Sequence, residues 1–108
     1  MISKWIRNQR CRPEPARPSP GELAMYRRMV PGWRVVGRRI ERRYSHSSPA
    51  NAMSFATAVG KVALLQGHLP ELSVDRRGVT VTLTTPGMGL TINDYIMAAR
   101  IDWLAGYR

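Results

Sequence analysis

Residues 68–94, HLPELSVDRRGVTVTLTTPGMGLTIND, decide the fold of this 108-residue chain. Within them Val79, Val81 and Leu83 alternate with threonines. This is the pattern of a strand with one buried face and one half-exposed face. Residues 71–77 precede it as a second short strand, so the two runs predict a β-hairpin.

A turn and a helix follow this hairpin. The run PGMG at residues 86–89 predicts the turn, because proline and glycine suit tight backbone bends. Thr91 with Asp94 three residues later forms a capping-box pattern, which marks the start of a helix. Its predicted buried stripe consists of Ile92, Ile96, Ala99 and Trp103.

The preceding residues repeat the arrangement of hairpin and helix. Residues 33–44 predict two strands around Gly37, and residues 50–66 predict a helix that Ser48 caps. A shorter helix is predicted at residues 21–30. The sequence therefore predicts an α+β fold in which three helices pack on one face of a four-stranded antiparallel sheet.

Residues 1–20 differ in composition from the rest of the chain. They contain four prolines among arginines, and proline denies the backbone the hydrogen bonds of helices and sheets. We expect a basic, proline-rich flexible arm at residues 1–20, followed by one domain at residues 21–108. Trp5 and Ile6 are its candidate binding contacts; a tail folded back onto the domain is the alternative.

Charge and composition limit the classes of function. The net charge is +10, and residues 1–48 account for nine of the ten excess positive charges. Such a field favours an anionic partner, which is nucleic acid, an acidic protein surface or an anionic lipid. The chain has one cysteine, no long apolar run, no metal-ligand cluster and no phosphate-binding loop motif. We expect a cytoplasmic protein without metal or cofactor.

Five arginines in the first predicted hairpin are the candidate partner-binding residues. They are too dense for a pair of strands whose side chains all face a core, so most of them should meet solvent or an acidic partner. A merely solvated basic face is the alternative. The five residues are Arg34, Arg38, Arg39, Arg42 and Arg43.

The chain from Trp33 to Arg108 resembles the pterin-4a-carbinolamine dehydratase family. The resemblance rests on His68, on the Pro70-Glu71 pair, and on the run from Gly89 to Asp94 that opens the last helix. The family dehydratase uses histidines as general acid and base on a hydroxylated pterin. The resemblance therefore implies a catalytic site built around His68, Pro70 and Asp94.

Two histidine positions of the family pattern are substituted in this chain. Leu69 replaces the second histidine of the His-His-Pro run, and Pro86 stands where the third is expected. Neither side chain can transfer a proton. We therefore expect a pseudoenzyme, with His68, Pro70 and Asp94 as remnants of a site that has lost its reaction.

The resemblance is stronger to one branch of the family, the inactive dehydratase-like proteins encoded with α-carboxysomes. It implies a non-catalytic protein that assists RuBisCO folding or assembly, associated with the carboxysome. Two alternatives stay open: a residual 4a-hydroxytetrahydropterin dehydratase, and a partner of nucleic acid or a transcription complex. The open edges of a four-stranded sheet further predict a homodimer, or a tetramer.

Overall fold

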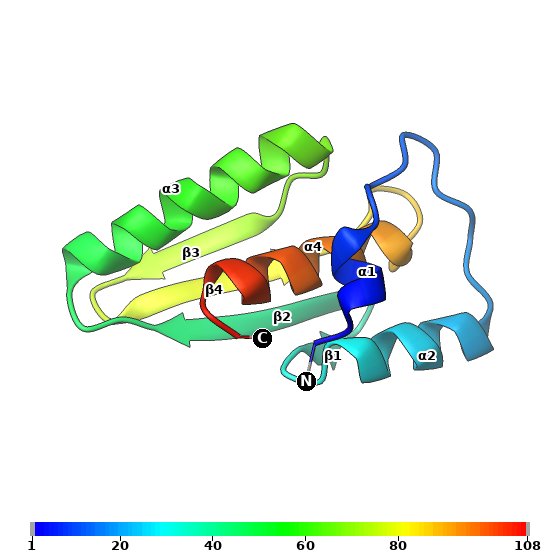
Figure 1. Ribbon diagram of the computed structural model, residues 1–108, viewed down its shortest axis with the longest axis horizontal. Helices are drawn as coiled ribbons and strands as arrows, with labels where there is room; N and C mark the ends of the chain where they lie inside the picture. The colour runs from blue at the N-terminus through cyan, green and yellow to red at the C-terminus, as the bar shows by residue number, and fades with distance from the viewer. Residues whose placement is uncertain (1, 108) are drawn as a thin grey trace.

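The computed structural model of the protein describes residues 2–107 and contains one four-stranded antiparallel sheet (Figure 1). Its strands are β1 (Arg34–Val36), β2 (Arg39–Ser45), β3 (Glu71–Asp75) and β4 (Gly78–Leu83). They lie in the order β1-β2-β4-β3, so the two predicted hairpins meet at the β2–β4 pair. One edge of the sheet is the short β1 and the other is β3.

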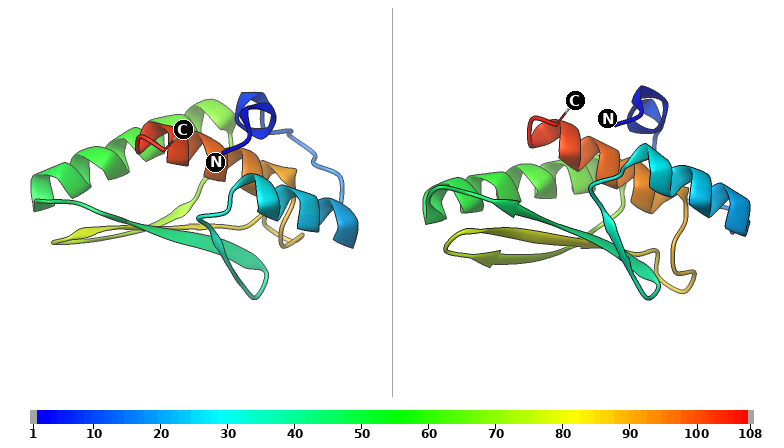
Figure 2. Two further views of the ribbon diagram at one scale, coloured as in Figure 1. Left: turned by 60° about the horizontal axis from the view of Figure 1, so that its bottom comes forward. Right: turned by 90° about the horizontal axis from the view of Figure 1, so that it is seen from below.

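The helices of the described residues lie on one side of this sheet, as both views in Figure 2 show. They are α1 (Lys4–Asn8), α2 (Pro20–Met29), α3 (Pro49–Gln66) and α4 (Ile92–Leu104). The predicted α+β fold is confirmed, with α1 as an additional fourth helix. Among the described residues, no helix is long and apolar enough to cross a membrane.

The helix boundaries follow the capping residues of the sequence. Ser19 and Thr91 each form a complete capping box, and Ser48 accepts a hydrogen bond from the backbone N–H of Asn51. Gly67 ends α3 in the left-handed conformation with φ of 67°, which a glycine adopts without a steric penalty. These signals place the loops on which the candidate site is built.

Strand β2 separates its side chains between the two faces of the sheet. Ile40 and Tyr44 are buried under the helices, and Ile40 pairs with the buried Leu83 of β4. Arg39 and Arg43 alternate with them and lie exposed on the opposite face.

Helix α4 is the centre of the helical layer and is buried on more than one side. Ile96 and Ala99 are buried, as predicted, but Met97 and Ile101 are also fully buried. Trp103 was expected in the buried stripe, yet 41% of its surface is exposed and the guanidinium of Arg7 lies 3.9 Å from its ring centroid. The other faces of α4 are covered because α1, α2 and α3 all pack against it.

The N-terminal segment is packed on the body, whereas the sequence suggested a flexible arm. Ile6 of α1 is fully buried in the common core, and burial of such a side chain contributes about 1.5–3 kcal/mol. The backbone carbonyl of Gln9 accepts two hydrogen bonds from Arg100 of α4. The described part of residues 1–20 is therefore folded back onto the domain, which matches the second reading of the sequence.

Candidate active site

His68 is positioned by the end of α3. It follows Gly67 directly, and its backbone N–H donates to the carbonyl of Ala63 in the last turn of the helix. Its ring is buried, with 7% of the side chain exposed. The left-handed turn at Gly67 therefore directs the imidazole inward, towards the start of α4.

Asp94 meets His68 at this point. The Nε2 atom of His68 lies 2.7 Å from Oδ1 of Asp94, and the carboxyl group is fully buried. A carboxylate only accepts hydrogen bonds, so this contact places the proton of the neutral ring on Nε2. The other ring nitrogen, Nδ1, is then the one that can gain and lose a proton.

The second oxygen of Asp94 is held by the loop before α4. Its Oδ2 accepts hydrogen bonds from the Thr85 hydroxyl at 2.8 Å and from the Thr91 backbone N–H at 2.9 Å. The two threonine hydroxyls lie 2.8 Å apart. Asp94 thus caps α4 with one oxygen and holds His68 with the other, and its orientation is fixed from both sides.

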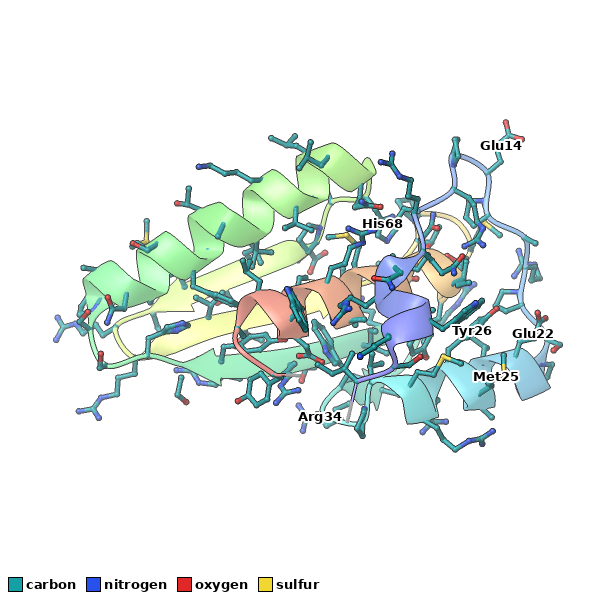
Figure 3. The ribbon with its side chains drawn as sticks, viewed as in Figure 1. Glu14, Glu22, Met25, Tyr26, Arg34 and His68 are labelled. Carbon is teal, nitrogen blue, oxygen red and sulfur yellow. The ribbon has the colours of Figure 1, made fainter. Side chains whose placement is uncertain are left out.

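A cavity of about 580 Å³ opens beside this pair, within the size range of small-molecule sites. His68 and Thr85 contribute to its wall, and Figure 3 shows His68 below the N-terminal segment that carries Glu14. The lining residues are Cys11, Arg12, Pro13, Glu14, Pro15, Gln66, Gly67, His68, Thr85, Pro86, Met88 and Asn93. The buried titratable pair and the cavity together have the form of a candidate active site.

The structure separates the other residues of the predicted remnant. Pro70 is half-buried and does not line the cavity, so only His68 and Asp94 of the three come together. Leu69 points away, with 70% of its surface exposed, whereas Pro86 contributes to the cavity wall. His46 precedes α3, about 27 Å of helix away from His68, and therefore belongs to no common site with it.

The five candidate partner-binding arginines do not form one free basic patch. Arg34 pairs with Glu41 and Arg39 with Glu71, while Arg43 makes two bonds of 2.7 and 2.9 Å to Asp75. The side chain of Arg38 lies against Gly89. Arg42 turns to the helical side of the sheet and is largely buried. Their role in binding a partner stays a prediction.

The Arg43–Asp75 pair bridges β2 and β3 across the central strand β4. The hydrogen bonds from Arg43, and then the one from the Arg77 backbone, hold the pKa of Asp75 well below its ordinary value. The same contact raises the pKa of Arg43. Both groups are solvent-exposed, so the pair is screened by water.

A buried polar network around Asp102 was missed by the sequence reasoning. Its carboxylate accepts hydrogen bonds from the Trp33 indole at 3.1 Å, from Arg42 at 3.0 Å and from the Tyr44 hydroxyl at 2.5 Å. Burial raises the pKa of Asp102, against the opposing effect of these three donors. An aspartate inside an apolar helix was the available signal, since a buried carboxylate needs partners.

Within residues 2–107, no three histidine, cysteine or acidic side chains are grouped closely enough to hold a metal ion. The site offers a hydrogen-bonded imidazole and carboxylate beside a cavity. Such a pair suits general acid–base catalysis, in which the carboxylate orients the imidazole and stabilises its protonated form.

Comparison with known proteins places this geometry in a family. The family described as "Pterin 4 alpha carbinolamine dehydratase" matches residues 17–104. The "Putative pterin-4-alpha-carbinolamine dehydratase 1" of Gloeobacter violaceus is 34% identical over 100 residues, which is 88% of this chain and 86% of that protein. The "Putative pterin-4-alpha-carbinolamine dehydratase" of Nitrosococcus oceani is 35% identical over 99 residues, 87% of this chain and 88% of that protein.

A solved structure agrees with the sequence relatives. The "transcriptional coactivator/pterin dehydratase" from Brucella melitensis superposes with a TM-score of 0.77 at 28% identity, covering 84% of this chain and all of that one. The prediction of a non-catalytic pseudoenzyme is wrong, because the relatives that match most of this chain carry the name of an enzyme. The chain belongs to the pterin-4a-carbinolamine dehydratase family.

Proposed function

We propose that this protein is a dehydratase of 4a-hydroxytetrahydropterins. The observation that carries the proposal is the buried contact of 2.7 Å between His68 and Asp94 at the wall of the cavity. The names of the relatives supply the substrate class. A cavity of about 580 Å³ has room for a bicyclic pterin.

The reaction removes one water molecule across the C4a–N5 bond of the pterin. The proton on N5 leaves, the hydroxyl on C4a departs as water after gaining a proton, and a C4a–N5 double bond forms. No proton is consumed overall, so one imidazole can accept the N5 proton and return a proton to the leaving hydroxyl. Asp94 stabilises the imidazolium ion that exists between these two transfers.

His68 lines the cavity, and one such histidine is sufficient for acid–base catalysis although Leu69 and Pro86 replace the other two histidines of the family pattern. One positioned acid–base group contributes about 10²–10⁴-fold to a rate. A site with one such group and an orienting carboxylate is weaker than a site with three histidines, but it remains a catalyst. We therefore expect dehydration well above the uncatalysed rate.

The test is the dehydration rate of a 4a-hydroxytetrahydropterin with purified protein and with two histidine variants. His68→Ala should lose about 10²–10⁴-fold in kcat, the scale of one acid–base group. His46→Gln is the matched control, because His46 lies at the opposite end of α3, and it should retain the activity of the unmodified protein. Equal activity of His68→Ala, or no acceleration by the unmodified protein, would overturn the proposal.

A partner-binding role stays a second prediction, with RuBisCO as the client suggested by resemblance to the α-carboxysome branch. The net charge of +10 and the exposed Arg39 and Arg43 favour an acidic partner. Glutamate substitutions at these positions would also repel Glu71 and Asp75, so Arg39→Gln with Arg43→Gln is the cleaner variant. RuBisCO capture that weakens in this variant and at high salt would support the prediction, and capture unaffected by both would contradict it.

A further inference from the structure

One wall of the cavity comes from residues that precede the match to the family model. Residues 11–15 line the cavity together with His68, whereas the family match begins at residue 17. In Figure 3 the N-terminal segment that carries Glu14 runs above His68. We call residues 11–15 the N-terminal wall. The wall is therefore contributed by residues that lie before the match to the family model.

Asn93 fixes the N-terminal wall with both ends of its side-chain amide. Its Oδ1 accepts a hydrogen bond from the backbone N–H of Arg12, and its Nδ2 donates to the backbone carbonyl of Arg12, both at 2.8 Å. Only 3% of Asn93 is exposed. The amide thus pairs with the backbone of Arg12 as a neighbouring strand would, over 81 residues of sequence separation.

A second anchor comes from the end of α3. The side-chain carbonyl of Gln66 accepts a hydrogen bond of 2.9 Å from the backbone N–H of Cys11. Gln66 is two residues before His68, and Asn93 is next to Asp94. The wall is therefore tied to the end of α3 and the start of α4, where His68 and Asp94 lie.

The composition of the wall suits a flat heterocycle. Pro13 and Pro15 have ring side chains with apolar faces, and proline has no backbone N–H that would need a partner. Met88 and Pro86 add further apolar surface to the same cavity. A planar ring system gains from contact with such surfaces while its polar edge is left for the groups near His68.

We propose that the N-terminal wall is part of the pterin-binding site and that Asn93 is the positioning residue that holds it in place. The inference rests on the proposed function, because it assigns the ligand as a pterin. The inference concerns the affinity for the pterin and not the reaction. The wall binds the ring system, and His68 with Asp94 performs the reaction.

Cys11 provides a natural reporter of the wall. It is the single cysteine of the chain, and its Sγ lies 3.6 Å from the backbone carbonyl of Asn93. Burial raises the pKa of this thiol to about 11. The thiolate is the reactive form, so Cys11 should react slowly with an alkylating agent as long as the wall is docked.

The experiment measures the binding of 7,8-dihydrobiopterin by calorimetry and the alkylation of Cys11 by iodoacetamide, using the full chain. In the unmodified protein, saturating pterin should slow the alkylation. Asn93→Ala should bind the pterin roughly tenfold more weakly or worse, the scale of two lost hydrogen bonds. It should also be alkylated faster, and its KM for the hydroxylated pterin should rise while kcat stays within about twofold.

Matched variants separate the wall from the stability of α4. Arg12→Pro removes the backbone N–H that donates a hydrogen bond to Asn93 and leaves Asn93 itself unchanged. Arg12→Ala keeps both hydrogen bonds between Asn93 and the backbone of residue 12. Both variants lose the Arg12 side chain, so the difference between them reports the backbone pairing alone: Arg12→Pro should bind the pterin several-fold more weakly than Arg12→Ala. Asn51→Ala, in the first turn of α3, is the control for an asparagine outside the site.

The outcomes distinguish this inference from the proposed reaction. The inference is overturned if the unmodified protein shows no pterin binding or no protection of Cys11, or if Arg12→Pro binds the pterin as tightly as Arg12→Ala. If the pterin binds and the variants differ as described, but no dehydration occurs, the binding role of the N-terminal wall is supported and the proposed reaction is contradicted.

Discussion

Asp94 takes part in two interactions that the fold and the proposed reaction each require. One oxygen accepts a hydrogen bond from the backbone N–H of Thr91 at the start of α4, and the other is hydrogen-bonded to the ring of His68. A capping aspartate is a common feature of helices and by itself indicates no catalysis. The short buried contact with His68 is what gives this residue a chemical role.

This double role predicts the behaviour of Asp94→Asn. The amide can still accept the hydrogen bond from Thr91, but it carries no charge to stabilise an imidazolium and can force the other tautomer on His68. We expect a loss of roughly 10²-fold or more in the dehydration rate, with a loss of only about 1 kcal/mol in the free energy of unfolding.

Thr85→Val is the companion variant for this measurement. It removes one donor to Asp94 and leaves the carboxylate charge in place, so its rate should fall much less than that of Asp94→Asn. Kinetics of the dehydration and urea unfolding of both variants provide the check. Equal rates for the two variants would show that the charge of Asp94 is unimportant.

At the scale of elements, strands β2 and β3 are linked across β4 by the pair of Arg43 and Asp75. The pKa of Asp75 is lowered from its ordinary value of 3.8 by this contact. A carboxyl group with a depressed pKa in the folded state stabilises the protein above its unfolded pKa. That contribution is lost as the pH falls below 3.8 and through the folded value.

We therefore predict a pH-dependent difference between the unmodified protein and Asp75→Asn. The unmodified protein should have the higher thermal unfolding midpoint at pH 6, and the two midpoints should converge as the pH falls below about 3.8. The measurement is a series of thermal melts from pH 6 to pH 2. Because both groups are exposed, the difference should be small and should shrink in salt. A gap that stays constant over this range would exclude the ion pair as its cause.

Local signals in the sequence were sufficient for most elements and insufficient for contacts between distant ones. The alternation of Val79, Val81 and Leu83 and the capping box at Thr91 act within a few residues, so they predicted β4 and α4. Helix α1 was missed because it has five residues and one buried side chain, Ile6. Its stability comes from packing on α4, which no short-range pattern records.

The candidate site likewise has residues that the sequence identified and contacts that it did not. His68 and Asp94 were identified through the family pattern, but the substitutions at Leu69 and Pro86 led to a wrong conclusion about catalysis. The pairing of Asn93 with Arg12 and the bonds of Asp102 to Trp33 join residues 69 or more positions apart. Such contacts depend on how α4 lies against the N-terminal segment and the sheet, and the sequence alone does not give that arrangement.

At the scale of the whole molecule, the edge strand β3 is the most open part of the fold. All five of its residues are exposed, including Leu72 and Val74, although both share the helix-facing side with buried residues of β4. Leu64, Leu65 and Leu69 are also exposed at the adjoining end of α3. An edge with unpaired backbone groups beside an apolar strip is suited to pairing with a second strand.

A second copy of the chain is the simplest occupant of this edge. Two β3 strands related by a two-fold axis would pair antiparallel and join their sheets, so that Leu72 and Val74 would be covered on both copies. We predict that the protein is a homodimer at micromolar concentration. Light scattering coupled to gel filtration should give about twice the chain mass of 12.2 kDa.

Charge on the same edge should dissociate this dimer. Val74→Lys adds an ammonium group to the β3 edge of each copy, where like charges near the two-fold axis repel and the apolar contact is lost. The variant should elute at the monomer mass and keep the circular dichroism of the unmodified protein, because Val74 is 39% exposed in the single chain. Lys61→Ala, on the exposed side of α3, is the control and should remain dimeric. A dimer that survives Val74→Lys would place the interface elsewhere, and a monomeric unmodified protein would show that β3 stays open.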